Sequence, residues 1–341
     1  MSAFAPTLRA LIGGRHQTQD EMRAAVGAIM DGEWTAAQAG AFLATLASKG
    51  EHVDEVVGAA SAMRERSRHV EHGLPLVADV CGTGGDNAQT INVSTCVAFV
   101  VAGAGIPVAK HGNRAASSKC GSADVLETLG VRIDEPPEDA AKRLERGRFA
   151  FLFAQRYHPA MKQVAPVRGE LGVRTIFNVL GPLTNPARAT HQVIGVASEA
   201  HLELVGEALR RLGATAGAVV HATSGIDEVA GDVPTHVYQF DAGGVRRWLL
   251  EPADCGVHAP QGAIAGGDPA FNAAALRAIL DGEHSPRADV IALNAALAFV
   301  VAERAGSLAE GLQLARDTIA SGAALAAFEA ARAAVAERHD P

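Results

Sequence analysis

The sequence predicts an α/β protein in which a small helical domain precedes a larger domain with a mostly parallel sheet. Residues 1–73 carry helix signals and no strand signal, whereas from residue 74 onward short apolar runs alternate with helical patterns. Strands that alternate with helices are typical of a parallel sheet covered on both faces. We therefore expect a helical domain at 1–73, with helices near 162–185 packing on it, and an α/β domain at 74–341.

Several helices are predicted within the first domain. Thr18 with Glu21, and Thr35 with Gln38, have the spacing of capping boxes, in which each side chain bonds the other residue's backbone N–H. Apolar residues then recur at helical spacing, at Phe42, Leu43, Leu46, Val53, Val56 and Val57. Gly50 lies between these two runs and is expected to end the earlier helix.

The second domain is predicted to hold several buried strands and a less regular final part. The apolar runs that predict strands lie at 74–80, 106–112, 149–154, 191–198 and 216–223. Residues 236–240 and 245–252 predict a hairpin or a sheet edge. Asp268 with Pro269, and Ser307 with Glu310, mark helix starts, and the alanine-rich C-terminal stretch predicts helix.

Composition argues against several classes of protein. The 341 residues suggest about two domains, and the formal net charge of −8 argues against a general nucleic-acid binder, which needs a basic face. The four cysteines form no CxxC pair, which fits a reducing cytoplasm. The longest apolar run, 97–109, is interrupted by glycine and proline and is too short to span a membrane, and the first residues lack a signal-peptide pattern.

A glycine-rich loop follows the first predicted strand, in the stretch DVCGTGGDNAQTINVST. Gly82, Gly84 and Gly85 permit a sharp turn and a close approach of backbone N–H groups to a ligand. Ser94 and Thr95 lie where a helix begins, and helix N-termini favour phosphate. A tight turn before a capped helix explains the same residues without a ligand, so the loop alone leaves both interpretations open.

A second polar loop follows the next predicted strand, in the stretch KHGNRAASSKCGSADVLE. Its cations are Lys110, Arg114 and Lys119, and both residue types suit phosphate. An isolated basic run is usually solvated. Here, however, two loops of this kind each follow a strand, and ligands of such sheets lie at the carboxyl ends of strands. Together the loops suggest a ligand with two phosphate groups.

Two later segments carry further charged residues. Asp227 and Glu228 are adjacent acids after the strand at 216–223. Such pairs are usually solvated, but opposite phosphate loops they would suit Mg²⁺, which prefers one or two carboxylates with phosphates and water. Arg168 and Arg174 flank Glu170, an arrangement that helix ends and ion pairs explain, although Arg168 could also bind a carboxylate substrate.

In this order, the motifs resemble those of the anthranilate phosphoribosyltransferases. They are GTGGD with the T, N and ST that follow it, KHGNR with the serines and GSAD, HPAMK, VAPVR, LGPL and the acidic pair, and the similarity covers essentially the whole chain. The resemblance implies the fold of the nucleoside phosphorylases and phosphoribosyltransferases and a homodimer. It also implies transfer of the phosphoribosyl group of phosphoribosyl pyrophosphate to the amine of anthranilate, in tryptophan biosynthesis, with magnesium.

The resemblance further implies roles for the residues that match these motifs. Those expected at the donor are Gly82, Gly85, Asp86, Thr90, Asn92, Val93, Ser94, Thr95, Lys110, His111, Gly112, Asn113, Arg114, Ala115, Ala116, Ser117, Ser118 and Ser122. Those expected at anthranilate are Asn113, Arg168 and the Gly82 backbone, and those expected at magnesium are Ser94, Asp227 and Glu228. No dedicated base is expected, because an aromatic amine is already neutral near pH 7; Lys110 and Arg168 would act by charge and positioning.

Three positions depart from the common family pattern. Asn87, Ile91 and Cys120 stand where glycine, phenylalanine and serine are usual. Asparagine tolerates the left-handed backbone better than other residues with a side chain, and the other two changes remove no polar role.

Three other interpretations compete with this one. A pyrimidine nucleoside phosphorylase would carry Lys-His-Ser in place of Cys81-Gly82-Thr83, which this chain lacks. A non-catalytic nucleic-acid-binding relative would be basic and would have lost the acidic pair. A phosphoribosyltransferase for another aromatic acid is harder to exclude, because pocket shape decides the acceptor.

The helical domain is also expected to form the dimer contact. Its apolar helix faces, such as that of Phe42 and Leu46, are predicted to meet a second copy. The active site is then expected between the two domains, where pockets often lie.

Overall fold

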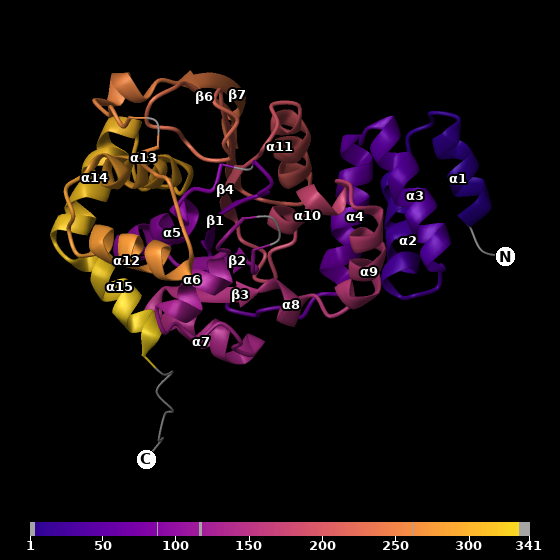
Figure 1. Ribbon diagram of the computed structural model, residues 1–341, viewed down its shortest axis with the longest axis horizontal. Coiled ribbons are helices and arrows are strands. Elements are labelled where there is room, and N and C mark those ends of the chain that lie inside the picture. The colour runs from indigo at the N-terminus through magenta and orange to yellow at the C-terminus, as the bar shows by residue number, and fades with distance from the viewer. Residues whose placement is uncertain (1–3, 87, 116–117, 261, 334–341) are drawn as a thin grey trace, which may run out of the picture.

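The computed structural model describes residues 4–86, 88–115, 118–260 and 262–333. A bundle of helices lies at one end of the molecule, and a larger α/β domain forms the rest (Figure 1). The predicted fold class is therefore confirmed. None of the described helices combines the length and the apolar character that crossing a bilayer requires.

The helical domain begins with four helices whose ends follow the predicted signals. They are α1 (Phe4–Ile12), α2 (Gln19–Met30), α3 (Ala36–Lys49) and α4 (Val53–Glu65). Thr18 and Thr35 form complete capping boxes with Glu21 and Gln38. Gly50 ends α3 with a φ of 86°, a left-handed value that glycine adopts without steric cost.

The α/β domain is built on one seven-stranded sheet. The strands are β1 (Ala78–Gly82), β2 (Val108–Gly112), β3 (Phe149–Phe153), β4 (His191–Gly195), β5 (Ala216–Ala222), β6 (Thr235–Asp241) and β7 (Gly244–Leu250). Their order is β3-β2-β1-β4-β5-β6-β7. The pairs from β3 to β5 are parallel, and β6 and β7 add an antiparallel hairpin at one edge, as the sequence predicted.

Helices cover both faces of this sheet (Figure 1). The helices after β1 are α5 (Val93–Gly103), α6 (Ser122–Thr128), α7 (Pro137–Gly147), α8 (Ala154–Tyr157), α9 (Met161–Leu171), α10 (Phe177–Leu183), α11 (His201–Arg211), α12 (Pro269–Leu280), α13 (Pro286–Val301), α14 (Leu308–Ala320) and α15 (Ala323–Arg332), with a 3₁₀ turn at Pro252–Cys255. Of these, α9 packs on α2 and α3 of the helical domain and not on the sheet. The helices α5 and α13 share a core with one face, and α7, α10 and α11 pack on the other.

Three local expectations differ from the structure. The first strand begins at Ala78 rather than at residue 74. Ser307 caps α14, but the Glu310 carboxylate accepts from the N–H of Gly306 at 2.8 Å instead of completing a capping box. The C-terminal stretch forms two helices, because Gly322 with a φ of 77° separates α14 from α15.

The expected dimer residues are wrong. Phe42 and Leu46 are both 0% exposed, and they belong to a cluster that also contains Val167 of α9 and Leu209 of α11. The helical period places them on the inner side of α3, so they form the core of the domain and cannot meet a second copy.

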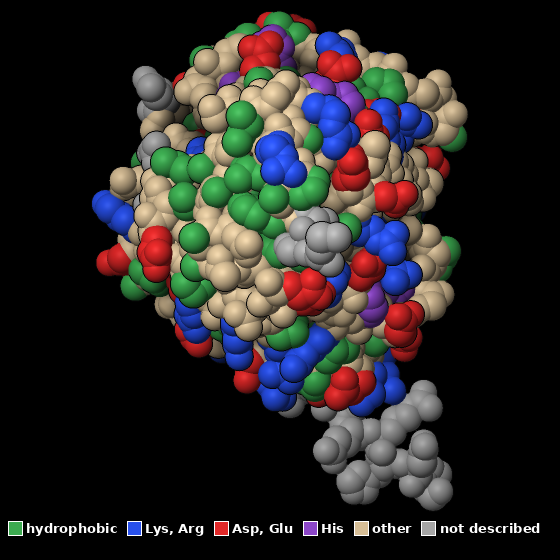
Figure 2. All heavy atoms as spheres, turned by 90° about the vertical axis from the view of Figure 1, so that its right-hand side faces the viewer, with side chains coloured by type: hydrophobic (Ala, Val, Ile, Leu, Met, Phe, Trp, Pro, Cys, Tyr) green, Lys and Arg blue, Asp and Glu red, His purple; other side chains and the backbone are tan. Residues whose placement is uncertain are grey.

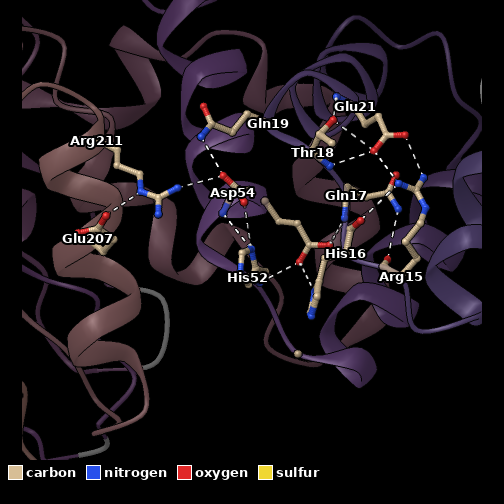
Figure 3. A network of polar contacts seen from close by, with 12 residues as sticks. Arg15, His16, Gln17, Thr18, Gln19, Glu21, His52, Asp54, Glu207 and Arg211 are labelled. Atoms are coloured by element: carbon tan, nitrogen blue, oxygen red, sulfur yellow. Dashed lines mark hydrogen bonds and ion pairs between the residues drawn. The ribbon is translucent and has the colours of Figure 1, made fainter.

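A polar network also joins the helical domain to the sheet domain (Figure 3). The Asp54 carboxylate of α4 accepts from Arg211 of α11 at 3.0 Å and from Gln19 of α2 at 2.9 Å. The neighbouring Glu55 carboxylate is fully buried and is satisfied by the backbone N–H of Gln17 and the Lys49 ammonium, each at 2.9 Å. The start of α4 is thus fixed from both sides.

Candidate active site

Three loops meet at the carboxyl edge of the sheet. The loops after β1 and β2 leave neighbouring parallel strands, so they emerge side by side. The loop after β5 leaves the same edge, two strands further along. The polar segments that the sequence singled out are therefore gathered at one place.

The glycine loop is held directly against the acidic pair. The backbone N–H of Gly84 donates to the Asp227 carboxylate at 2.7 Å. A Cβ atom on Gly82 would lie 2.4 Å from the same carboxylate oxygen, so glycine is what permits this approach. Glycine is therefore needed at position 82 because a side chain there would collide with Asp227.

Acids crowd the space between these two loops. The N–H of Asp227 donates to the Asp86 carboxylate at 3.4 Å. Burial, with a smaller contribution from Asp86, raises the pKa of Asp227 to about 6. Burial and the neighbouring Asp227 also hold the pKa of Glu228 well above its usual range.

This crowding suits a divalent cation that neutralises the acids. Within the described ranges, no three His, Cys, Asp or Glu side chains are grouped so that they could hold a metal ion. Asp227 and Glu228 would therefore need ligand oxygens or water to complete a coordination shell. Mg²⁺ is commonly bound in this way, by one or two carboxylates together with phosphates.

Lys110 differs from the open cation that the sequence suggested. Its side chain is 1% exposed, and its ammonium group donates to the carbonyl of Val80 at 2.7 Å and to the Ser94 hydroxyl at 3.1 Å. Burial lowers its pKa, and Asp79 and Glu228 oppose that shift by their charge. Lys110 therefore lies beneath the site and reaches it through Ser94.

The N-terminus of α5 forms the wall between the first two loops. Ser94 is partly exposed there, whereas Val93 and Thr95 are buried. The Thr95 hydroxyl is buried and has no hydrogen-bond partner among the described residues. Thr90 pairs with Ala265 in an isolated bridge, which fixes the approach to the helix.

The second loop is tied to α6. The Arg114 guanidinium pairs with Asp124 at 2.9 Å and with Glu127 at 2.8 Å. The N–H of Ala115 also donates to Asp124, and the Ser122 hydroxyl donates to the carbonyl of Asn113. Further along the loop, Ser118 and Lys119 are exposed, while Ala116 and Ser117 lie outside the described residues.

His111 and His158 form a buried pair at the end of β2. Their Nε2 atoms lie 3.2 Å apart, and the Nδ1 of His111 lies 3.0 Å from the carbonyl oxygen of Gly181. Burial lowers the pKa of His111 to about 4, so the ring is neutral. Next to the pair, Gly112 has no room for a side chain, because a Cβ atom would lie 2.2 Å from the Ser122 hydroxyl.

Arg168 is the guanidinium with the clearest capacity for an added carboxylate. It is half-buried on α9, its pKa is lowered by burial, and its carbon Cζ lies 5.7 Å from the centre of the Phe177 ring. Among the described residues no acid, Glu170 included, is paired with it, and burial is the only influence on its pKa. Arg174 instead donates to the carbonyl of Gly85 at 3.2 Å. Ion pairs with Glu170 therefore do not explain the two arginines.

Several residues of the site were missed from the sequence. Asp79 is fully buried in β1, and its carboxylate accepts from Asn185 at 2.7 Å and from the N–H of His111 at 3.3 Å. An acid inside the apolar run LPLVADV was a visible signal for Asp79. His158 opens the HPAMK motif, but only the fold brings His158 and Asn185 next to β2.

Two hollows lie away from these loops. One of about 370 Å³ is lined by Gln239, Arg246, Arg304 and neighbouring residues, and one of about 190 Å³ by His69, His72 and Arg188. Neither contains the acidic pair or the glycine loop. We place the active site at the loops, because the chemistry-bearing side chains converge there and because the two domains meet beside it.

Comparison with known proteins shows the family of the chain. Residues 74–325 match a family model described as the α/β domain of a glycosyl transferase family, and residues 5–67 match the helical bundle domain of the same family. The chain is 50% identical over 321 residues to the anthranilate phosphoribosyltransferase of Chloroflexus aurantiacus, over 93% of this chain and 94% of the relative.

Solved structures are similar along the whole chain. The anthranilate phosphoribosyltransferase of Thermus thermophilus superimposes with a TM-score of 0.90 at 44% identity, covering 95% of this chain and 97% of that one. The Saccharomyces cerevisiae enzyme in complex with PRPP and Mg gives a TM-score of 0.88 at 27% identity, covering 96% of each chain.

Proposed function

This chain belongs to the family of the anthranilate phosphoribosyltransferases, and we propose that it joins anthranilate to phosphoribosyl pyrophosphate at the loops described above. The products are N-(5-phosphoribosyl)anthranilate and pyrophosphate, in tryptophan biosynthesis. The observation that carries this proposal is the 2.7 Å bond from Gly84 to Asp227, which supports one site for the phosphates and their metal.

The donor is proposed to bind along the first two loops. Gly82, Gly85, Asp86 and Thr90 would contact it from the first loop, together with Asn92, Val93, Ser94 and Thr95 at the start of α5. The residues from Lys110 to Ser118, with Ser122, would continue the site. Free N–H groups at the helix start favour phosphate oxygens, and the buried Lys110 keeps the Ser94 oxygen in place.

Magnesium is proposed to be held by Asp227, Glu228 and Ser94 together with donor oxygens. The fit rests on the close approach of the acids, because the N–H of Asp227 donates to the Asp86 carboxylate at 3.4 Å and Glu228 follows directly. Burial and the neighbouring acids raise the pKa values of Asp227 and Glu228. When bound, the metal neutralises the pyrophosphate as it leaves. The protein itself supplies one positive charge near the acids, the ammonium group of Lys110, which lies beneath them.

Anthranilate is proposed to bind beside Arg168 and Asn113. The half-buried guanidinium lacks an acid partner in the described part of the chain, and a carboxylate would supply one through two parallel hydrogen bonds. The aromatic ring of Phe177 supports the guanidinium from one side. Asn113 and the backbone of Gly82 would orient the acceptor toward the donor.

The chemistry then needs position and charge more than a base. The neutral amine of anthranilate attacks C1 of the ribose with its lone pair, the bond from C1 to the pyrophosphate oxygen breaks, and the amine loses a proton to water. The chain's part is to align the two substrates and to exclude water from the electron-poor ribose. The position of the site beside the junction of the two domains supports exclusion by domain closure.

A homodimer through the helical domain is proposed as the working form. The face of the molecule at that end carries a band of hydrophobic side chains (Figure 2). Ile12 and Val173 are 69% and 59% exposed, and α3 carries no charged residue between Ala36 and Ser48. A second copy is the occupant that an exposed apolar face of this kind fits best. The four free cysteines support a reducing compartment, which we propose is the cytoplasm.

A substrate panel tests this function. The purified protein with magnesium and phosphoribosyl pyrophosphate is given anthranilate, nicotinate or 4-aminobenzoate in parallel, and pyrophosphate release is measured. Release with anthranilate alone is expected. Faster release with another acid would make this chain a transferase for that acid, and no release with any of them would overturn the proposal.

A further inference from the structure

A chain of amide side chains crosses the start of α5 and links three segments of the site. Asn272 of α12 is 1% exposed, and its Nδ2 donates to the Oδ1 of Asn92 at 3.0 Å. The Nδ2 of Asn92 in turn donates to the carbonyl of Cys120 at 3.1 Å. Asn272 lies outside every motif that the sequence singles out.

Backbone groups at both ends of this chain fix the direction of every bond in it. The N–H of Gly267, which can only donate, bonds the Oδ1 of Asn272 at 2.8 Å. The other end of the Asn272 amide must then be its NH₂ group, so Asn92 meets it with oxygen. The carbonyl of Cys120 can only accept, and it meets the NH₂ group of Asn92. The orientation of both amides is therefore determined without reference to a ligand.

This orientation leaves Asn92 with one free donor. An amide NH₂ group carries two hydrogens, and only the bond to Cys120 uses one of them among the described residues. The amide oxygen is fully engaged, since the Cys120 thiol also lies 3.4 Å from it. Asn92 can therefore present an N–H to a ligand but cannot present its oxygen.

The segment before α12 holds the neighbouring backbone in the same place. The N–H of Ile91 donates to the carbonyl of Ile264 at 2.8 Å, and the N–H of Gly266 donates to the carbonyl of Gln89 at 2.8 Å. A Cβ atom on Gly266 would lie 2.4 Å from the carbonyl oxygen of Thr90. The end of the first loop, at residues 89–91, is therefore held against residues 264–266.

We infer that Asn272 is a positioning residue of the donor site, which sets the amide of Asn92 so that its free N–H faces an oxygen of the phosphoribosyl donor. The inference rests on the proposed function for the identity of that ligand. Asn272 itself touches no substrate and acts through Asn92.

The test replaces the amide donor while keeping its shape. In Asn272→Asp the Gly267 bond survives, but the second carboxylate oxygen faces the Oδ1 of Asn92 and forces that amide to turn. Asn272→Ala removes the bond altogether. Loss of one orienting hydrogen bond is expected to raise the KM for the donor about tenfold and to leave the KM for anthranilate within about twofold.

Acid should rescue the Asn272→Asp variant, because a protonated carboxyl can donate to Asn92 again. The new carboxyl would be buried, since Asn272 is 1% exposed, and burial raises the pKa of a carboxyl into an accessible range. The charged residues of the elements around it are Asp124 and Glu127 of α6, Asp268 and Arg277 at and within α12, and Glu329 and Arg332 of α15, whereas α5 has none. The KM for the donor should return toward the wild-type value as pH falls from 8 to 6, and Asn272→Ala should show no such return.

Two controls separate positioning from a general effect of a buried charge. Gln239→Glu introduces an equally buried carboxyl on β6, away from the site, and should leave the KM for the donor unchanged. In an Asn92→Ala background, Asn272→Asp should have no further effect on that KM.

An equal KM for the donor in the wild type and the Asn272 variants, or a full additional loss in the Asn92→Ala background, would overturn the inference. Absence of turnover in the wild type would overturn the proposed function itself and the donor assignment with it.

Discussion

Gly84 and Asp227, 143 residues apart in the sequence, are joined by a hydrogen bond of 2.7 Å. The bond attaches the loop that follows β1 to the acidic pair that follows β5. Gly82 makes the approach possible, because any Cβ atom there would meet the same carboxylate at 2.4 Å. One contact thus couples the phosphate loop to the metal acids.

Gly82→Ala should therefore lower turnover without unfolding the protein. The added methyl group meets the movable carboxylate of Asp227, which must turn away from Gly84. A displacement of about 1 Å at such a group costs roughly a hundredfold in rate. Steady-state kinetics and thermal unfolding would be measured together.

Gly147→Ala is the matched control for that variant. Nothing lies within 4 Å of a Cβ atom at this position, and it stands at the end of α7. It should keep the wild-type rate. Equal rates for both variants would show that the close approach at Gly82 has no function.

Arg168→Ala should weaken the binding of anthranilate more than the binding of the donor. Removing a charged, two-pronged contact from a half-buried site costs about 1.5–3 kcal/mol, or roughly tenfold to a hundredfold in KM. Arg168→Lys keeps the charge but loses the two-pronged hydrogen bond. Its KM for anthranilate is expected to lie between that of the wild type and that of Arg168→Ala. Equal increases in the KM of both substrates would point to a structural role for this residue.

Asp79 should make the stability of the protein depend on pH. Burial raises its pKa to about 6, above the value of about 3.9 in an unfolded chain. Between these values the folded state holds a proton that the unfolded state has lost, so stability falls as pH rises from about 4 to about 6. The difference of about 2 units corresponds to about 3 kcal/mol.

Asp79→Asn provides the reference for this effect. Urea unfolding of the two proteins at several pH values should show the wild type losing stability relative to the variant across that window. A constant difference between them at every pH would show that Asp79 titrates normally.

Ile12→Asp combined with Val173→Asp should give folded monomers. Both side chains are exposed, Ile12 at the end of α1 and Val173 just after α9, so charges there oppose a second copy without disturbing the core. Light scattering and circular dichroism would be compared with Phe42→Asp, which should unfold because that ring is 0% exposed. A folded dimer from the double variant would rule out this face as the interface.

The sequence was informative where a residue type is needed locally. The glycines and hydroxyls after β1, the capping boxes and the alternation of strands and helices each arise from short-range constraints. The sequence was less informative about which side of a helix or strand is covered by the rest of the protein. The helical period marked Phe42 as apolar but did not distinguish a core from an interface, and Lys110 looked like a loop cation although it points beneath α5.

Partners from distant segments could not be predicted in the same way. Arg114 was expected to be available to phosphate, but α6 folds back and pairs it with Asp124 and Glu127. Asn272 carries no local signal at all, because its place beside Asn92 is created by the packing of α12 against α5 and α6. Long-range contacts of this kind follow from the tertiary fold.

The most direct measurement is the dependence of turnover on magnesium concentration for the double substitution Asp227→Ala with Glu228→Ala. The proposed metal and the leaving pyrophosphate lie between this pair and the glycine loop. The variant should fold, bind anthranilate as the wild type does, and turn over slower by about 2–4 orders of magnitude at limiting magnesium. Wild-type turnover by the folded variant at limiting magnesium would contradict the account.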